Sequence, residues 1–468
     1  MPKRSIPKGM RYATLSALLL GLGGVGAWAA ADQREADTDQ PSVQAPEAVS
    51  VSVDQGSVTY VCPPGVIDPQ DLSVSLNVSG PFPTASGEAQ RLDGGGVALE
   101  VDPDADPDAD AGGASFVAAG QVSGDLASYL LAGCQLPSRE ALLPAGSTQV
   151  GEDTVLILSN PSTKPVTASV QVLSSIGAVL DAPQEVVVPA GSTFSVLPAI
   201  WAPLESRIAL LVQSDGQGVA AWLQSSGLEG EVPIGLGRLG AQSLSETISI
   251  IGIDSGQDNT LRLVNMGTSP AEMSIQLLTD HGKTPLAGVE GLVVEAHGVF
   301  DVALGDLPTS AYGLLVESEE PIAAAIRAVS EGQPFPEDET LNVSLRNLIG
   351  GADAVESVTV PGADILAEAA NALGFALVRS DVIIANLEDR AISVQVGDEV
   401  VLLDPGTSYT VALPATQTLI LQGEESAMIH AALIVEAEAD SGVFRSVVPL
   451  EEETLGSAQL EVVVFPQH

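Results

Sequence analysis

Three stretches of the chain repeat the same short pattern, and this repeat is the feature that most restricts the fold. Residues 154–160, 259–265 and 381–386 each read as a short apolar strand that ends in asparagine: TVLILSN, NTLRLVN and DVIIAN. A second segment follows each of them (ASVQV, MSIQL and ISVQV), and its glutamine lies 11, 11 and 9 residues after that asparagine. Apolar and polar residues alternate strictly in this second segment, which is the period-two pattern of a half-buried β-strand. The chain is therefore predicted to be built from repeated β units.

Further correspondences extend the repeat to six or seven short strands in each unit. Residues 186–196, 292–302 and 401–411 each read as a strand, a glycine-containing turn and a returning strand with an aromatic residue. Apolar hairpins follow at 209–222 and 313–326, and again at 419–432. The units begin 105 and 121 residues apart, and an immunoglobulin-like sandwich has ~100 residues and ~7 strands. The fold class predicted is all-β, with tandem immunoglobulin-like β-sandwich repeats after an N-terminal hydrophobic helix. A β-propeller is the alternative, although its blades repeat at roughly 40–50 residues.

Composition shifts and strand patterns divide the chain into eight segments. Between the second and third repeats, residues 363–377 have the apolar spacing of a helix, and residues 459–465 read as one closing strand. The predicted segments are a signal peptide or signal anchor (1–31), a flexible linker (32–52), a β domain with a cysteine pair and an acidic loop (53–140), repeat 1 (141–243), repeat 2 (244–332), a connection with a short helix (333–376), repeat 3 (377–446) and a C-terminal strand or tail (447–468).

The first 31 residues have the pattern of an export segment. Basic residues at 3, 4, 8 and 11 precede 20 uncharged residues, 12–31, and such a basic flank keeps the N-terminus inside while the rest of the chain is translocated. Cleavage after Ala29 or Ala31 fits the small-x-small rule and would give a secreted protein. Alternatively, about 20 residues can span a bilayer as an uncleaved anchor, with contacts to lipid from Tyr12, Leu18, Leu19, Leu20, Leu22 and Trp28. Both outcomes place the remaining chain outside the cytoplasm.

The charge of the chain excludes one class of partner. It has 17 basic and 61 acidic residues, a net charge of −44. The export segment carries +4, so the rest carries −44 − 4 = −48. A nucleic-acid-binding protein needs a basic surface to displace counterions from phosphates, so no nucleic-acid partner is expected.

Five carboxylates alternate along one short segment: Asp102, Asp104, Asp106, Asp108 and Asp110. Calcium loops use alternate oxygens in a similar way, but here two prolines interrupt the segment and the bidentate glutamate is missing. The two interpretations are a solvated acidic loop and a weak calcium site. No other cofactor is expected.

The chain has two cysteines, Cys62 and Cys134, both beyond the export segment. An even number of cysteines in an oxidising compartment predicts one disulfide, and two free thiols are the alternative.

Motifs for catalysis are missing from the sequence. The four histidines, at positions 281, 297, 430 and 468, lack the spacing of a metal site, and no G-x-S-x-G sequence occurs. Residues 252–256, GIDSG, read as a hairpin turn. We therefore predict no catalytic residues.

Several local motifs together resemble a known family. They are the VCPPG segment at 61–65, the LxLxNP strand end at 156–161, the VVVPAG turn at 186–191 and the ALLV hairpin at 209–212. With the basic start and the single apolar segment, the chain resembles an actinobacterial family of cell-envelope proteins that carry a domain of unknown function, over roughly residues 55–440. The resemblance implies an envelope location and brings no catalytic residues.

Three functional hypotheses follow from these observations. The first is a non-enzymatic extracytoplasmic envelope protein, a tethered or secreted β-sandwich array that binds or spaces an envelope protein or glycan. The second is an accessory subunit of a membrane enzyme or transporter. The third is an extracellular hydrolase.

Overall fold

The computed structural model describes residues 47–53, 58–82, 87–101, 115–336, 338–416, 419–424, 427–451 and 458–464. It divides into two compact units, residues 54–457 and residues 1–53 with 458–468. In the smaller unit, strands β1 (Glu47–Val53) and β36 (Ala458–Val464) pair antiparallel. Strand β36 coincides with the predicted closing strand, and β1 takes up the end of the predicted linker. The export segment and the acidic segment 102–110 lie outside the described residues.

The larger unit begins with three small antiparallel sheets, which we call the N-terminal β unit. Their strand orders are β2-β7-β6, β3-β4 and β5-β8-β9. The strands are β2 (Val58–Cys62), β3 (Val66–Asp68), β4 (Asp71–Leu76), β5 (Val78–Phe82), β6 (Gly87–Arg91), β7 (Val97–Val101), β8 (Phe116–Gln121) and β9 (Ser128–Gly133).

Sandwich 1 follows, with two antiparallel layers. One layer has the order β10-β16-β12-β13 with β14 also on β12, and the other has the order β15-β11-β17-β18. The predicted alternation on β12 is confirmed, because Val166, Ala168 and Val170 are buried while the residues between them are less so. The strands are β10 (Glu140–Leu143), β11 (Glu152–Asn160), β12 (Val166–Ser174), β13 (Gly177–Ala178), β14 (Gln184–Val188), β15 (Ser192–Val196), β16 (Ala209–Ser214), β17 (Ala220–Glu229) and β18 (Val232–Gly240), with a short 3-10 helix η2 (Pro198–Ile200).

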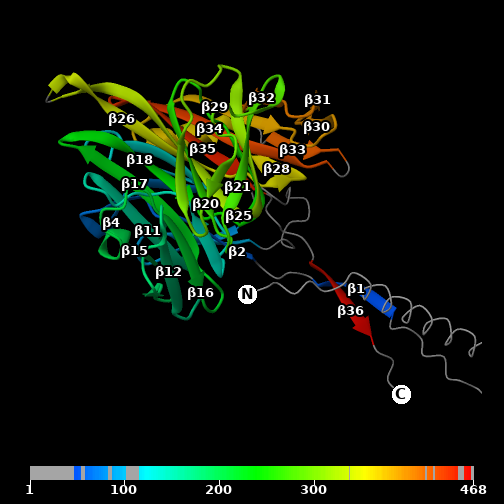
Figure 1. The fold of residues 1–468 in the computed structure, drawn as a ribbon, viewed down its shortest axis with the longest axis horizontal. Helices are drawn as coiled ribbons and strands as arrows, with labels where there is room; N and C mark the ends of the chain where they lie inside the picture. Colours follow the sequence, from blue (N-terminus) through cyan, green and yellow to red (C-terminus); the bar gives the residue numbers. More distant parts are fainter. Residues whose placement is uncertain are drawn as a thin grey trace, which may run out of the picture. The chain divides into compact units, whose positions relative to one another are not determined.

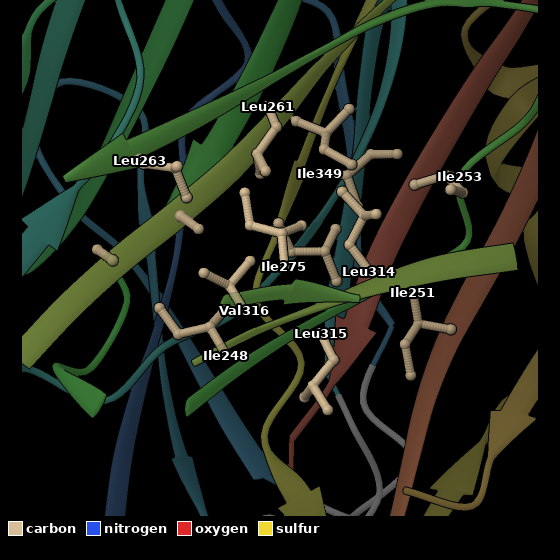
Figure 2. Packing of buried hydrophobic residues seen from close by; sticks show 14 of the residues in the cluster. Ile248, Ile251, Ile253, Leu261, Leu263, Ile275, Leu314, Leu315, Val316 and Ile349 are labelled. Carbon is tan, nitrogen blue, oxygen red and sulfur yellow. The ribbon is translucent and has the colours of Figure 1, made fainter. Parts of the chain in front are cut away.

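Sandwich 2 repeats this arrangement with one difference, the long strand β25 (Ala311–Phe335). Its first part pairs with β19 and β21, and its second part pairs with β20 and β26, so it takes the places of both β16 and β17. The other strands are β19 (Ser245–Ile251), β20 (Asp258–Asn265), β21 (Ala271–Thr279), β22 (Gly282–Pro285), β23 (Leu292–Val294), β24 (Val299–Ala303) and β26 (Asp338–Gly350). Figure 2 shows aliphatic side chains of these strands, among them Leu261, Ile275 and Val316, packed together in the core of sandwich 2.

Sandwich 3 has the layers β28-β33-β30-β31 and β27-β34-β29-β32, with β35 on β34. Helix α2 (Ala363–Ala372) covers its core with Leu366, Ala369 and Ala370, as the predicted helical spacing requires. The strands are β27 (Ala354–Val355), β28 (Ser357–Val360), β29 (Ala376–Ala385), β30 (Ile392–Val396), β31 (Glu399–Leu403), β32 (Ser408–Ala412), β33 (Leu419–Gly423), β34 (Ile429–Ala439) and β35 (Gly442–Leu450). The tandem-sandwich interpretation is thereby confirmed, since each repeat forms two facing layers.

The segment 333–376, expected as a connection with a short helix, also contains β26, β27 and β28. The sequence pattern does not indicate strand β26, because its first half is polar and exposed and only its second half is buried. Strands β27 and β28 are two and four residues long, which is too short for a period-two pattern to stand out.

The repeated asparagines have the same structural role in all three sandwiches. Asn265 donates from Nδ2 to the carbonyls of Ser269 (2.8 Å) and Val294 (2.9 Å), and its Oδ1 accepts from Gly267 N (2.8 Å). Asn160 and Asn386 make the equivalent bonds in sandwiches 1 and 3, and all three are fully buried. Each asparagine thus fixes a turn to the neighbouring strand, which explains why the repeat ends in this residue.

We expect Asn265→Ala to lower the free energy of unfolding by about 2–3 kcal/mol, because it leaves buried backbone groups without partners. Urea denaturation measures the change. The exposed Asn342→Ala on β26 is the control and should change stability by less than about 0.5 kcal/mol. Equal effects of the two substitutions would refute the role assigned to Asn265.

Each of the four β units contacts two others. The N-terminal β unit packs on sandwich 1, where the Gln224 amide bonds both Ile67 N (3.1 Å) and Ile67 O (2.6 Å). It also packs on sandwich 3, where Leu131 N donates to Ser446 Oγ (2.9 Å) and the rings of Tyr129 and Phe375 lie 5.2 Å apart.

Sandwich 2 lies against sandwiches 1 and 3, and Figure 1 shows β20, β21 and β25 between the strands of the other two. Strand β18 approaches β26 through glycines, because a Cβ on Gly235 would lie 2.4 Å from Arg346 N. On the other side, Tyr312 Oη donates to Gly406 O (2.6 Å) and Lys283 Nζ donates to Leu387 O (2.7 Å). The four units therefore form a closed circuit of contacts.

Candidate functional site

A cavity of about 320 Å³ lies where the four β units meet. Ligand pockets commonly have volumes of ~300–1,000 Å³. Every unit contributes side chains to the wall: Tyr60 and Leu131, Trp222 and Leu239, Ile248 and Leu348, and Val447 and Val448. The site thus depends on the assembly of all four units.

The amide of Gln242 is an unpartnered polar group in this wall. The backbone N of Gln242 donates a hydrogen bond to Leu142 O at 2.8 Å. Its side chain lies over Gly350, where an added Cβ would come within 2.5 Å of Gln242 Nε2. Both Nε2 and Oε1 are buried and have no hydrogen-bond partner within the described part of the chain. A buried amide of this kind offers one acceptor and a donor to a ligand with the complementary pair.

The neighbouring Gln135 shows the contrasting case. Its Nε2 donates to Ala241 O (3.1 Å) and its Oε1 accepts from Ala241 N (3.3 Å). Both ends of this amide are satisfied, so it supports the wall and is not available to a ligand.

Arg238 is a buried cation in the same wall. Its Nη1 donates to Pro64 O (2.6 Å), and its Nη2 donates to Gly65 O (2.6 Å) and Gln224 Oε1 (2.9 Å). Burial lowers the pKa of its guanidinium to about 9, so it stays charged at neutral pH. The residue ties the turn after β2 to sandwich 1 and gives this wall a positive charge.

Two carboxylates, Asp353 and Glu451, lie at another part of the wall. Glu451 is accessible to solvent, yet the protein around its carboxyl, together with the charge of Asp353, raises its pKa to about 7. The pocket therefore combines an acidic side, a buried cation and a neutral amide.

Ser249 and His430 form a hydrogen-bonded pair between sandwiches 2 and 3. Ser249 Oγ lies 2.8 Å from His430 Nδ1 and donates to Ala352 O at 2.8 Å. A serine nucleophile must give its proton to the base and must reach a substrate. Ser249 instead donates to a carbonyl and is only 3% exposed. The pair therefore has a structural role, as a hydrogen bond between the two sandwiches.

His430 makes stability depend on pH. It faces Ser249, the Ala352 carbonyl, Asp353 and Lys283. Burial lowers the pKa of the imidazole below 6.5, while the bond to Ala352 and the charge of Asp353 oppose this change. The unfolded chain then binds the proton more readily than the folded chain, so this contribution to stability is complete above about pH 6.5 and is lost as the pH falls.

We expect His430→Asn to reduce the fall in unfolding free energy between about pH 6.5 and 5, measured by urea denaturation at a series of pH values. His281→Asn is the control, since the His281 side chain is 85% exposed. A slope unchanged by His430→Asn would contradict the assignment.

Of the site residues predicted from the sequence, the structure describes the two cysteines, Cys62 and Cys134. Cys62 and Cys134 form a disulfide, and Cys134 lies in the wall of the pocket. The five aspartates at 102–110 and the predicted anchor residues lie outside the described residues. Within the described ranges, no group of three or more metal-binding side chains occurs, and no helix has the length and apolarity needed to cross a membrane.

Sequence reasoning missed Gln242 and Arg238. The one available signal was the run of glycines at 235, 237 and 240 in a strand, because glycine inside a strand often marks the close approach of another backbone. That signal indicates that another strand approaches this one closely, but it does not identify the residues that line a pocket.

Comparison with known proteins identifies a family without an assigned activity. No curated protein and no solved structure matches the chain. Residues 88–373, more than half of the chain, match a family of unknown function. This match covers strands β6 to β28 and most of the pocket wall, and the chain belongs to the family of unknown function DUF5719.

Proposed function

We propose that this protein is a non-enzymatic, extracytoplasmic cell-envelope protein, tethered or secreted, that binds a partner in the central pocket. One observation carries the proposal: four β units jointly line a 320 Å³ cavity whose Gln242 amide has no hydrogen-bond partner among the residues that the structure describes. The group it would take is a neutral one with a donor and an acceptor, such as a peptide amide or an acetamido group of a glycan. The Cys62–Cys134 disulfide supports the location, because disulfides persist in oxidising compartments.

The Gln242→Leu variant separates a ligand-binding role from a structural one. Leucine has a similar volume and removes two buried polar atoms that lack partners, so the free energy of unfolding should rise by about 1–2 kcal/mol while binding is lost. Urea denaturation gives the first quantity. A variant that is destabilised would show that the amide supports the fold and would count against its role in binding.

Photo-crosslinking in intact cells tests the binding role itself. A benzoylphenylalanine at Ser243, an exposed residue of the pocket wall, should capture a discrete envelope component, whereas one at Val150, which is 88% exposed on sandwich 1, should not. Gln242→Leu should abolish the adduct at Ser243. Identical adducts at the two positions, or an adduct that survives Gln242→Leu, would refute the pocket as the binding site.

The location is tested independently with a compartment-sensitive reporter fused after His468. We expect activity outside the cytoplasm, because the basic residues before position 12 favour export of everything that follows. Activity of a cytoplasm-specific reporter would overturn this part of the proposal.

A further inference from the structure

Sandwich 2 turns one face of its β20-β25-β26 layer toward sandwich 1. Arg327 lies opposite Thr260 on β20 and Leu348 on β26, while Ala325 lies opposite Arg262. Ala325 and Leu348 belong to the same hydrophobic cluster as the core of sandwich 1, which places this face at the interface. Three of the 13 arginines in the chain, Arg262, Arg327 and Arg346, gather here.

Two of these arginines already have carboxylate partners. Arg346 binds Glu152 in a two-bonded pair (2.8 and 3.0 Å), and its Nη1 also donates to Ser225 Oγ (2.8 Å). Arg262 binds Asp301 in the same manner (2.7 and 2.9 Å) and donates to Ile208 O (3.1 Å). Each carboxylate is therefore neutralised by one guanidinium.

Arg327 is the third cation and lacks such a partner. Its nearest carboxylate oxygen, Glu152 Oε1, is 3.7 Å away and is already bonded to Arg346. No hydrogen bond from its guanidinium occurs to the described residues. The side chain is 43% exposed, so a ligand can reach it. Three cations and two carboxylates give this cluster a net charge of +1, in a chain whose net charge is −44.

A cavity of about 30 Å³ lies beside Arg327, lined also by Glu152, Ser225, Thr260, Arg262 and Asp301. This volume holds about two water-sized groups. Burial and the charge of Arg346 lower the pKa of Arg327, and the charges of Glu152 and Asp301 oppose this change only in part.

We propose that Arg327 and the cavity beside it form a binding site for a single carboxylate group of a ligand or partner. The planar guanidinium matches the two oxygens of a carboxylate through parallel N–H···O bonds. The hydroxyl of Thr260, directly across the strand pair, supplies a further donor. Inorganic phosphate, a larger tetrahedral anion, is the comparison anion for this site.

Binding is tested by titrating sodium acetate into the full chain labelled with 15N-arginine, with sodium chloride at the same ionic strength as reference. The NMR signal of the Arg327 Nε–Hε group should shift as acetate is added, and the shift should reach a plateau at saturation. The apparent affinity for acetate should fall at least about tenfold in Arg327→Gln. It should fall about threefold to fivefold in Arg327→Lys, which keeps the charge but loses the planar guanidinium that donates two parallel N–H bonds. Arg139→Gln is the matched control, an exposed arginine of sandwich 1 outside the cluster.

Two outcomes would overturn the proposal. One is an equal shift of the Arg327 signal with sodium chloride, which would show that the added salt only screens the charge of Arg327 and that acetate has no specific site. The other is inorganic phosphate that binds as tightly as acetate, which would show a general anion surface. Unchanged far-UV circular dichroism of Arg327→Gln establishes that any loss of binding arises in a folded protein.

Discussion

Replacing Cys62 and Cys134 together by alanine is expected to lower the free energy of unfolding by about 4 kcal/mol. The cysteines are 72 residues apart, so the bond closes a long loop and removes much of the conformational freedom of the unfolded chain. Cys62 also lies two residues before Pro64, the first of the two residues, Pro64 and Gly65, whose carbonyls accept hydrogen bonds from Arg238. The variant should therefore loosen one wall of the pocket.

Urea denaturation of the double variant, with and without dithiothreitol, measures this effect. Wild-type protein should lose a similar amount of stability when it is reduced, and the variant should not respond to the reductant. A loss below about 1 kcal/mol, or a variant that remains sensitive to dithiothreitol, would contradict the expectation.

Replacing Arg346 by methionine is expected to cost about 3–5 kcal/mol, because it leaves the Glu152 carboxylate buried without its main partner. Glu152 is 5% exposed and Arg346 is 2% exposed at the side chain. Removal of both charges by Glu152→Leu with Arg346→Met should recover most of this loss, since an apolar pair of similar size can replace a buried ion pair.

The four proteins of this double-mutant cycle are compared by urea denaturation, with Arg139→Met as an exposed control that should change stability by less than about 0.5 kcal/mol. If the double variant is as unstable as Arg346→Met alone, the cost arises from lost packing and not from an unpaired charge.

The sequence predicts the fold within each unit better than it predicts the pocket. Alternation along β12 and the hairpin pattern of β16 and β17 depend on local periodicity, and Asn160, Asn265 and Asn386 each fix a turn a few residues away. Such features repeat three times and are readable from one chain. The polar half of β26 gives no such signal, so the unit boundaries near it are not readable.

The candidate sites depend on contacts between residues far apart in the sequence. Gln242 lies over Gly350, and Arg346 meets Glu152 across 194 residues. Neither residue has a local pattern that distinguishes it from other polar residues in strands. The acidic segment 102–110, the most distinctive motif in the sequence, lies outside the described residues.

The closed circuit of contacts has a consequence for the order in which the protein is made. Leu131, near the beginning of the folded part, bonds Ser446, 315 residues later. A ribosome adds roughly 5–20 residues per second, so the N-terminal β unit would wait about 15–60 s for the partner that covers its β9 face. For most of this interval Tyr129 also lacks the ring of Phe375, which lies 375 − 129 = 246 residues later in the chain. A chain that emerges vectorially would expose this apolar edge until Ser446 has emerged, which makes chains truncated before this residue prone to aggregate.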